Sequence, residues 1–248
     1  MENMPATIIS AYTVPSEAEE RFNKWFDGAY ASLYLKVPGM KEIDRYKNLS
    51  KGIDSPSYLH IFHHESVSTL KKIGENRDRN AVILDTLTWT NEWFWVNCCQ
   101  LVRSFRNAAF SRGGRENSIV DNAPVIHVEG YKIPPAELEK YSNWFTRWAS
   151  RLYIPLLLKG TDVKCFNYYR VLDYRPSHWE NYNLLEPEPP PFLSVSYFED
   201  TNALENFKTS LEYAAFKRSL DFEFSGNVKT VWNSEYQLFI SHRPQPGA

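Results

Sequence analysis

Short stretches rich in β-branched and aromatic residues recur along the chain and alternate with segments of helical periodicity. The short stretches are bounded by turn residues, which is typical of β-strands. They occupy residues 6–13, 41–48, 57–64, 95–106, 124–132, 162–172, 192–198 and 230–242. Segments 16–36 and 135–154 instead repeat apolar residues every three or four positions, which predicts amphipathic helices. Shorter helices are expected after the third strand of each half, so each half has the order β-α-β-β-α-β of a ferredoxin-like unit.

The two halves of the chain also resemble each other in sequence. Residues 12–26, YTVPSEAEERFNKWF, align without a gap with residues 131–145, YKIPPAELEKYSNWF, at an offset of 119 residues. Two later pairs of segments match in the same order at larger offsets, 57–65 with 191–199 and 95–106 with 232–243. Three matches in one order indicate a tandem duplication with insertions in the loops.

The duplication divides the chain into two α+β modules. We expect a first ferredoxin-like module at residues 1–107, a linker at 108–122 and a second module at 123–248. The linker contains two adjacent glycines and mixed charge without periodicity. A loop rich in proline and acidic residues, 173–191, is inserted in the second module, and it is either a lid over a pocket or a solvated insertion.

Composition limits the partners and the location that we expect. The 248 residues carry a formal net charge of −2, which gives no electrostatic footprint for nucleic acid or for an anionic membrane. No apolar run approaches the roughly 20 residues of a membrane span, and the start of the sequence shows no secretory signal. Three cysteines, two of them adjacent, make a poor disulfide framework and favour the reducing cytoplasm.

Aromatic residues are unusually frequent at 15% of the chain, with 8 Trp, 15 Tyr and 15 Phe. Rings in this number indicate either an apolar cavity for a small ligand or a core built mainly of aromatic side chains. The sequence carries no nucleophile elbow, phosphate loop or dinucleotide fingerprint. The partner that these observations favour is a small apolar substrate.

Short motifs in the first half resemble a known family. They are the segment FNKWFD at residues 22–27, Val-Pro-Gly at 37–39 and Arg-Tyr at 45–46. Together with the tandem β-α-β-β-α-β plan, they resemble the EthD-like branch of the dimeric α/β-barrel superfamily, whose tandem members are familiar from fungal genomes. The resemblance covers both halves except for the linker and the loop 173–191. It implies that the antiparallel sheets of the two modules pack as one pseudo-dimeric α/β barrel, in a monomer or a homodimer.

The same resemblance implies a cofactor-independent enzyme. Its leading form is acid/base chemistry on an aromatic or polyketide-like molecule, as in a cyclase, decarboxylase or isomerase of biosynthesis. One alternative is a cofactor-free monooxygenase of anthrone-like or quinone-like substrates. Another alternative is a non-catalytic protein that binds a small molecule or acts as a scaffold.

The family resemblance also singles out one pair of adjacent positions in each half. EthD-like proteins often carry a Glu-His pair shortly after the tryptophan motif, facing the pocket. Here these positions hold Ala29 and Tyr30 in the first half, and Trp148 and Ala149 in the second. Tyr30 is therefore a candidate proton donor, although a phenol with a pKa of about 10 is a poor base near neutrality.

Two histidines on predicted central strands are further catalytic candidates. His60 lies on the third strand of the first half, whereas His127 shares a strand face with Glu129 in the second half. A carboxylate can orient a histidine and raise its basicity; the alternative is a polar patch between the halves. We expect one main pocket that contains His60 or His127, in the first half because Tyr30 replaces the imidazole of the family.

The remaining candidates would bind the substrate. Tyr58, Phe62 and His64 share the strand face of His60. Trp25 either lines the pocket or packs in the core, and Arg45 either holds an anionic oxygen or forms an ion pair at the surface.

We expect no metal and no cofactor. His60 and His64 lie about 13 Å apart along a strand, too far to share one ion. No cluster of cysteines or carboxylates at ligand spacing completes a site.

Overall fold

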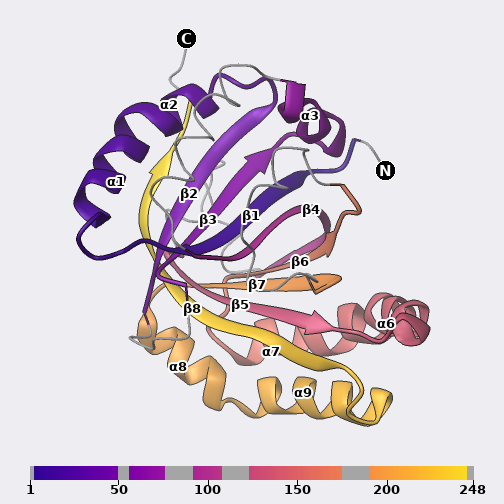
Figure 1. Ribbon diagram of the computed structural model, residues 1–248. Coiled ribbons are helices and arrows are strands. Elements are labelled where there is room, and N and C mark those ends of the chain that lie inside the picture. The colour runs from indigo at the N-terminus through magenta and orange to yellow at the C-terminus, as the bar shows by residue number, and fades with distance from the viewer. Residues whose placement is uncertain (1–2, 50–55, 76–91, 108–122, 175–189, 245–248) are drawn as a thin grey trace. The chain divides into compact units, whose positions relative to one another are not determined.

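The computed structural model describes residues 3–49, 56–75, 92–107, 123–174 and 190–244. The predicted linker and residues 175–189 of the predicted inserted loop lie outside the described residues. The described chain is of the α+β class (Figure 1). Its strands follow one another in the hydrogen-bonded order β1-β3-β2-β8-β5-β7-β6-β4 and form a closed barrel, and the pairings described below are antiparallel.

The chain divides into two compact units, and the boundaries at 101/102 and 237/238 fall inside strands. The first unit contains residues 1–101, 171–189 and 238–248, and the second contains 102–170 and 190–237. The boundaries fall there because strands β4 (Glu92–Arg106) and β8 (Lys229–His242) are long and contribute residues to both units.

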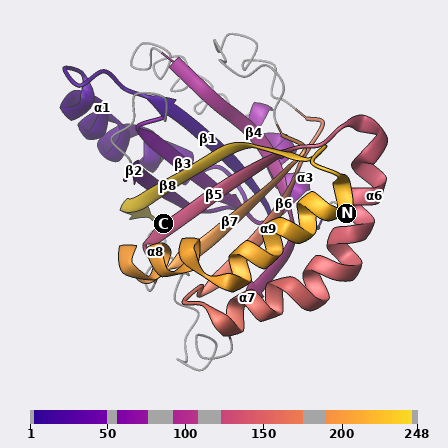
Figure 2. The same cartoon turned by 90° about the horizontal axis from the view of Figure 1, so that it is seen from below.

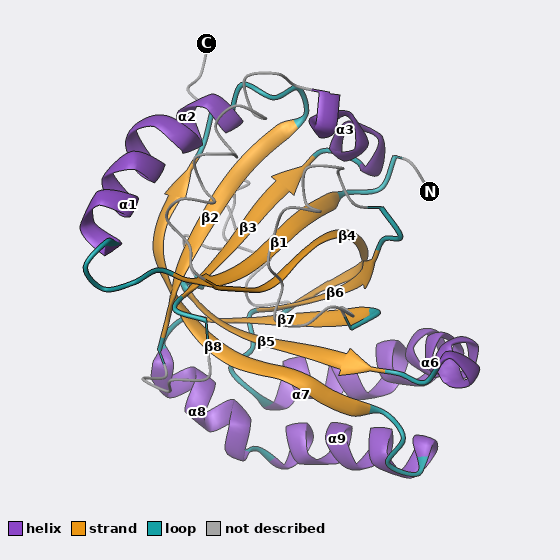
Figure 3. Ribbon diagram, viewed as in Figure 1, coloured by secondary structure: helices purple, strands orange, loops and turns teal. Residues whose placement is uncertain are grey.

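The first unit places one long helical segment on its sheet (Figure 3). Its other strands are β1 (Ala6–Thr13), β2 (Met40–Asn48) and β3 (Tyr58–His64), and β1 pairs with both β3 and β4. The helical segment consists of α1 (Glu19–Trp25), a π-helical turn η1 (Phe26–Tyr30) and α2 (Ala31–Tyr34). A short helix α3 (Val67–Lys71) and a 3-10 turn η2 (Lys72–Glu75) follow β3.

The second unit has the same order of strands and more helix. Its strands β5 (Val125–Lys132), β6 (Cys165–Val171) and β7 (Phe192–Phe198) join β8, and β5 pairs with both β7 and β8. Its first helical segment comprises η4 (Pro135–Glu137), α6 (Leu138–Trp144), the π-helix η5 (Phe145–Tyr153) and α7 (Ile154–Gly160). Helices α8 (Thr201–Thr209) and α9 (Leu211–Phe224) follow β7, and α9 lies beside α7 (Figure 2).

The two long helices differ from their prediction in their ends and in their internal geometry. The first begins at Glu19 rather than at 16, and the second continues to Gly160 rather than ending at 154. The sequence predicts continuous helices at 16–36 and 135–154, whereas both contain π-helical turns, at Phe26–Tyr30 and Phe145–Tyr153. A π-helical turn holds more residues than an α-helical one, so it rotates the side chains that follow it. Such turns are frequent at functional sites.

The core of the first unit accounts for many of the aromatic residues. Phe22, Phe26, Tyr30 and Tyr34 of the helical segment form ring contacts with one another and with strand residues, at centroid distances from 4.5 to 6.4 Å. All four are buried. Part of the aromatic excess is therefore a helix-on-sheet core.

The structure also describes the cysteines and the apolarity of the helices. Cys98, Cys99 and Cys165 are buried and free of disulfides. None of the helices in the described residues has the length and apolarity that crossing a bilayer requires.

We expect the Pro-Gly turn before β2 to tolerate no side chain at Gly39. Gly39 has a φ of +83°, and a Cβ there would lie 2.6 Å from side-chain carbons of Thr69. The Thr69 hydroxyl accepts a hydrogen bond from the Ser66 N–H and so caps α3. Gly39→Ala should therefore lower the free energy of unfolding by about 3 kcal/mol.

Gly28 provides the matched control, because a Cβ there meets nothing within 4 Å. Gly28→Ala in the helical segment should raise the free energy of unfolding by roughly 0.5–1 kcal/mol. Urea unfolding of both variants checks the pair. Equal effects of the two substitutions would contradict the described turn.

Candidate active site in the first unit

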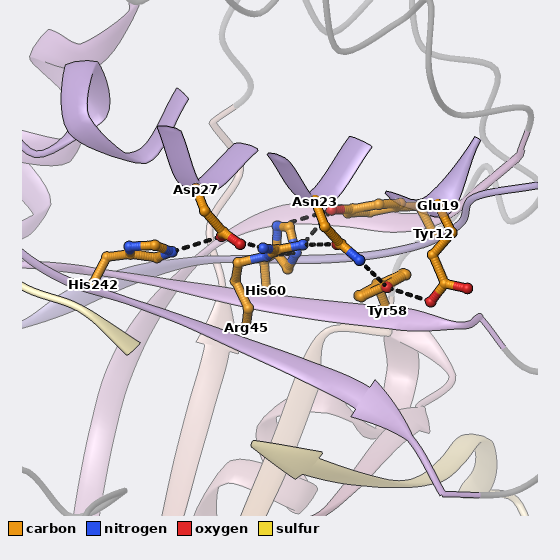
Figure 4. A network of polar contacts seen from close by, with 8 residues as sticks. All are labelled: Tyr12, Glu19, Asn23, Asp27, Arg45, Tyr58, His60 and His242. Atoms are coloured by element: carbon orange, nitrogen blue, oxygen red, sulfur yellow. Dashed lines mark hydrogen bonds and ion pairs between the residues drawn. The ribbon is translucent and has the colours of Figure 1, made fainter. Parts of the chain in front are cut away.

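The centre of the candidate site is Arg45 on β2, whose side chain is completely buried. Its guanidinium forms an ion pair with Asp27, and its Nη2 donates to Asn23 Oδ1 at 2.6 Å. Its Nε donates to His60 Nε2 at 3.2 Å. Figure 4 shows Asp27 and Asn23 reaching the guanidinium from the helix. A buried cation is costly unless it is paired, so these contacts stabilise the folded first unit.

One face of the helical segment α1–η1 supplies the polar partners. Glu19, Asn23 and Asp27 are spaced by four residues, which places them on one helix face. Phe22 and Phe26 flank the same face, and the Phe26 ring lies 4.2 Å from the Arg45 guanidinium carbon. The helix thus presents a carboxylate, an amide and an aromatic face to one cation.

His60 lies between this cation and a shell of aromatic rings. Phe26, Tyr12 and Phe62 have ring centroids 4.5, 4.9 and 5.9 Å from the imidazole. The Tyr12 hydroxyl lies 3.0 Å from Nδ1 and 2.8 Å from Nε2. Burial lowers the pKa of His60 well below its ordinary value, and the charges of Arg45 and His242 lower it further. His60 is therefore a neutral imidazole at physiological pH.

The contact with Arg45 also fixes the tautomer of His60. A guanidinium has donors only, so Nε2, which faces Arg45 Nε, carries the lone pair. The proton of the neutral ring then resides on Nδ1. The site offers one basic nitrogen, one permanent cation and the Tyr12 hydroxyl within a few ångströms of one another.

The acidic side of the network extends to the C-terminal end of β8. His242 Nε2 lies 2.9 Å from Asp27 Oδ1, and the two side chains are 15% and 30% exposed. Burial raises the pKa of Asp27, but the hydrogen bond from His242 and the charge of Arg45 outweigh it and lower the pKa. Asp27 is therefore ionised and balances the charge of Arg45.

A second branch leads from Asn23 toward Lys47. Asn23 Nδ2 donates to the Tyr58 hydroxyl at 3.1 Å, and that hydroxyl donates to Glu19 Oε1 at 2.6 Å. Lys47 Nζ donates to the same oxygen at 2.7 Å. Burial and the hydrogen bond to Glu19 raise the pKa of Tyr58, so Tyr58 stays protonated.

The structure brings some predicted site residues together and separates others. His60, Tyr58 and Arg45 belong to one polar network, and Phe62 contacts the His60 ring. The rings of Trp25 and Tyr30 lie 5.2 Å apart, both contact Phe26, and Tyr30 also contacts Phe62. His64 is buried farther along β3, with the Tyr34 ring at 6.4 Å.

The predicted pair of the second unit has other partners. Glu129 accepts hydrogen bonds from Tyr131, Tyr213 and Lys217 at 2.9, 2.8 and 3.0 Å. His127 Nε2 instead lies 2.6 Å from Asn233 Oδ1. Burial raises the pKa of Glu129, but the charges of His127 and Lys217 and the hydrogen bonds lower it on balance, so Glu129 is a buried anion.

The second unit offers an internal comparison for the network around Arg45. Arg45 is the strand partner of His60, and Tyr168 is the strand partner of Ser194 in the second unit. The Tyr168 ring stacks on Phe145 at 3.5 Å, where the first unit places its cation on Phe26. The sequence offset of 119 places Thr146 at the position of Asp27. The cation, its counter-ion and the imidazole are therefore specific to the first unit.

Sequence reasoning missed several members of the network: Tyr12, Glu19, Asn23, Asp27 and His242. The four-residue spacing of polar residues on the predicted helix is a signal that could have found three of them. Nothing local in the sequence indicates that His242 meets Asp27, because 215 positions separate them.

One group of metal-type side chains occurs among the described residues. Ligand atoms of Glu42, Asp44 and His63 all lie within 4.8 Å of one another. Ser241 donates to both carboxylates, and Arg243 forms an ion pair with Glu42 at 2.6 Å. These contacts already satisfy the carboxylates, and the absence of a metal stays a prediction.

Two histidines should give opposite pH dependences of stability. Below its unfolded pKa of about 6.5, the unfolded chain protonates His60 while the folded chain keeps it neutral, so stability rises with pH. Burial lowers the pKa of His63, but the hydrogen bond to Asp44 and nearby charges outweigh it and raise the pKa. His63 therefore stabilises below about pH 6.5, and its contribution is lost as pH rises through the folded pKa.

Urea unfolding between pH 5 and 8 tests the direction in which stability changes with pH for each histidine. The stability difference between wild type and His60→Phe should increase with pH up to about 6.5. The difference between wild type and His63→Gln should decrease with pH above about 6.5. The same pH slope for both variants would contradict the described environments.

Known proteins were compared by sequence and by structure. No protein-family model and no curated protein matches the sequence. An anthrone oxidase-like protein aligns with a TM-score of 0.65 at 12% identity, over 98% of this chain and 94% of that protein. A proposed monooxygenase of Fusobacterium nucleatum aligns with a TM-score of 0.62 at 6% identity, over 98% and 96% of the two chains.

A third solved structure, of a proposed monooxygenase from Lactobacillus acidophilus, has a TM-score of 0.54 at 10% identity. It covers 96% of this chain and 94% of that one. At such identities the likeness defines the fold alone. The chain therefore has the same fold as these proteins, and its described strands form a closed barrel.

Proposed function

We propose that the chain is a cofactor-independent enzyme that removes a proton from an apolar aromatic substrate in the first unit. The observation that carries this proposal is the neutral His60 beside the buried Arg45, inside a shell of aromatic rings. His60 Nε2 would accept the proton, and Arg45 would hold the oxyanion or enolate that forms. When the Arg45 guanidinium pairs with that anion, its charge lowers the pKa of the imidazole less. His60 then becomes a stronger base.

Substrate access requires a local opening, because His60 is only 1% exposed. The π-helical turn at Phe26–Tyr30 carries Asp27 and two rings of the shell. A π-helical turn already interrupts the regular hydrogen-bond ladder of the helix. We propose this turn as the segment that moves when substrate binds.

The carbanion has two possible fates in this proposal. In a cyclase, decarboxylase or isomerase it reacts within the substrate. In a monooxygenase it reacts with O2, and a methylene becomes a carbonyl, with one oxygen atom kept and the other released as water. The methylene then supplies all four electrons, so no cofactor is needed. Because proteins of the same fold are described as anthrone oxidase-like and as monooxygenases, we favour the reaction with O2.

We also propose that the chain is EthD-like and that it consists of two tandem modules. The FNKWFD motif supports an EthD-like protein of fungal type. Both units show the same strand order, and the repeat offsets map the strand partners Ser10 and His60 onto the partners Glu129 and Ser194. This agreement supports two tandem ferredoxin-like modules, at 1–107 and 123–248, from one duplication.

Oxygen uptake tests the proposed function. The purified full chain is incubated with anthrone-like compounds that carry an acidic methylene, without added flavin, haem or metal. We expect one O2 consumed per carbonyl formed, with no loss of rate when a chelator is present. Product without oxygen uptake would favour the cyclase and isomerase readings.

A non-catalytic binding protein is the second candidate function. The closed aromatic shell around His60 favours it, because the rings leave His60 almost no contact with solvent. Calorimetric binding of the same compounds without any turnover would support this candidate and overturn the enzyme.

A further inference from the structure

The outer face of the helix η5–α7 carries an unusual row of apolar side chains. Trp148, Leu152 and Leu156 are 60%, 45% and 50% exposed and are spaced by four residues. The inner face of the same segment is buried, with Phe145, Ile154 and Leu157 each at most 2% exposed. The three exposed residues, called the outer stripe below, are therefore not needed for the core.

The outer stripe is flanked by cations. Residues 141–160 contain Arg147, Arg151 and Lys159 and no acidic residue, and all three cations are exposed. Arg103 of β4 is a further exposed cation near this helix, where its Nη1 donates to the buried Ser150 at 3.4 Å. An acidic side chain, Glu212, lies at the C-terminal end of α7 against Gly160.

The first unit lacks the tryptophan and both arginines at the same repeat positions. The offset of 119 residues places Gly28 at the position of Arg147, Ala29 at Trp148 and Ser32 at Arg151. The helix fold therefore requires neither the exposed tryptophan nor the two arginines. They are specific to the second unit, where they form one local surface.

We propose that this surface binds the face of an anionic lipid bilayer. Amphipathic helices that lie on membranes combine Trp and Leu on one side with Lys and Arg beside them. Tryptophan favours the membrane–water interface, and cations near it are attracted to anionic headgroups. The net charge of −2 is a sum over the whole chain and does not describe this helix.

A second copy of the chain is a poorer occupant of this surface. In a symmetric dimer the same patch meets itself. Arg147 and Arg151 of one copy would then face those of the other, and like charges repel. An anionic surface matches the same cations, and the proposal is independent of the chemistry at His60.

Vesicle sedimentation of the full-length protein tests the proposal. We expect binding to vesicles that contain phosphatidylserine, weak binding to phosphatidylcholine alone, and release by salt. The double variant R147Q/R151Q should lower the partition coefficient roughly 30-fold, and Trp148→Ser should lower it for both lipids. Phe222→Ser on α9 is the matched control, because Phe222 is 88% exposed and lies outside the outer stripe.

Three results would overturn the proposal. One is the absence of wild-type binding to phosphatidylserine vesicles. Another is equal binding by wild type, R147Q/R151Q and Trp148→Ser. The third is a dimer in light scattering that Trp148→Ser dissociates, which would assign the surface to a second copy. Circular dichroism and thermal unfolding establish that each variant is folded before it is scored.

Discussion

Asp27→Ala should lower the free energy of unfolding by about 3 kcal/mol, because it leaves the Arg45 guanidinium buried without its counter-ion. Arg45 has no exposed side-chain surface, whereas Asp27 is 30% exposed. The remaining partners of Arg45, Asn23 and His60, are neutral and accept hydrogen bonds from it. Urea unfolding measures the loss.

Two matched variants separate the buried charge from other causes. Arg45→Met in the Asp27→Ala background removes the stranded cation and should recover at least half of the loss. Glu65→Gln breaks the ion pair of Lys41 and Glu65, which are 61% and 59% exposed, and should cost under about 1 kcal/mol. An Asp27→Ala cost no larger than that of Glu65→Gln would contradict the central role of the pair.

His60→Phe should lower the turnover number by about 10²- to 10⁴-fold, the range expected when a positioned general base is lost. Phenylalanine keeps a ring among Phe26, Tyr12 and Phe62, so the fold should persist. His63→Gln is the matched control, because it lies on the same strand with its side chain on the opposite face. Steady-state kinetics measures the turnover number of each variant, and thermal unfolding checks that the variant is folded.

Variants of two other candidates decide between the units. Tyr30→Phe removes the hydroxyl that the family resemblance singles out. Its loss should reduce turnover less than the loss of His60, because the Tyr30 ring packs on Phe26 and Phe62, whereas His60 contacts the cation Arg45 directly. His127→Gln should leave turnover close to that of wild type. If His127→Gln abolishes turnover and His60→Phe does not, the site lies in the second unit.

Local patterns in the sequence predict much of the fold. The first strand is predicted at 6–13 and observed at Ala6–Thr13, and the third is predicted at 57–64 and observed at Tyr58–His64. Alternation along a strand fixes which side chains share a face, and hydrophobic period identifies a helix. The π-helical turns escaped prediction because their i→i+5 hydrogen bonds depend on packing and leave little trace in the period of apolar residues.

The candidate site was predictable only on its strand side. His60, Tyr58 and Phe62 follow from strand parity alone. Arg45 could not be distinguished from a surface residue, because only the folded chain brings Asp27 and Asn23 to it. His242 belongs to a strand that starts in the other unit, so its contact with Asp27 is a property of the tertiary fold.

Deuterium exchange into the substrate under nitrogen is the most direct test of proton removal by His60. An anthrone-like compound is incubated with the protein in D2O, and exchange at its acidic methylene is followed by NMR before any oxidation can occur. Wild type and His63→Gln should accelerate the exchange, and His60→Phe should not. Equal acceleration by His60→Phe, or none by wild type, would contradict proton removal by His60.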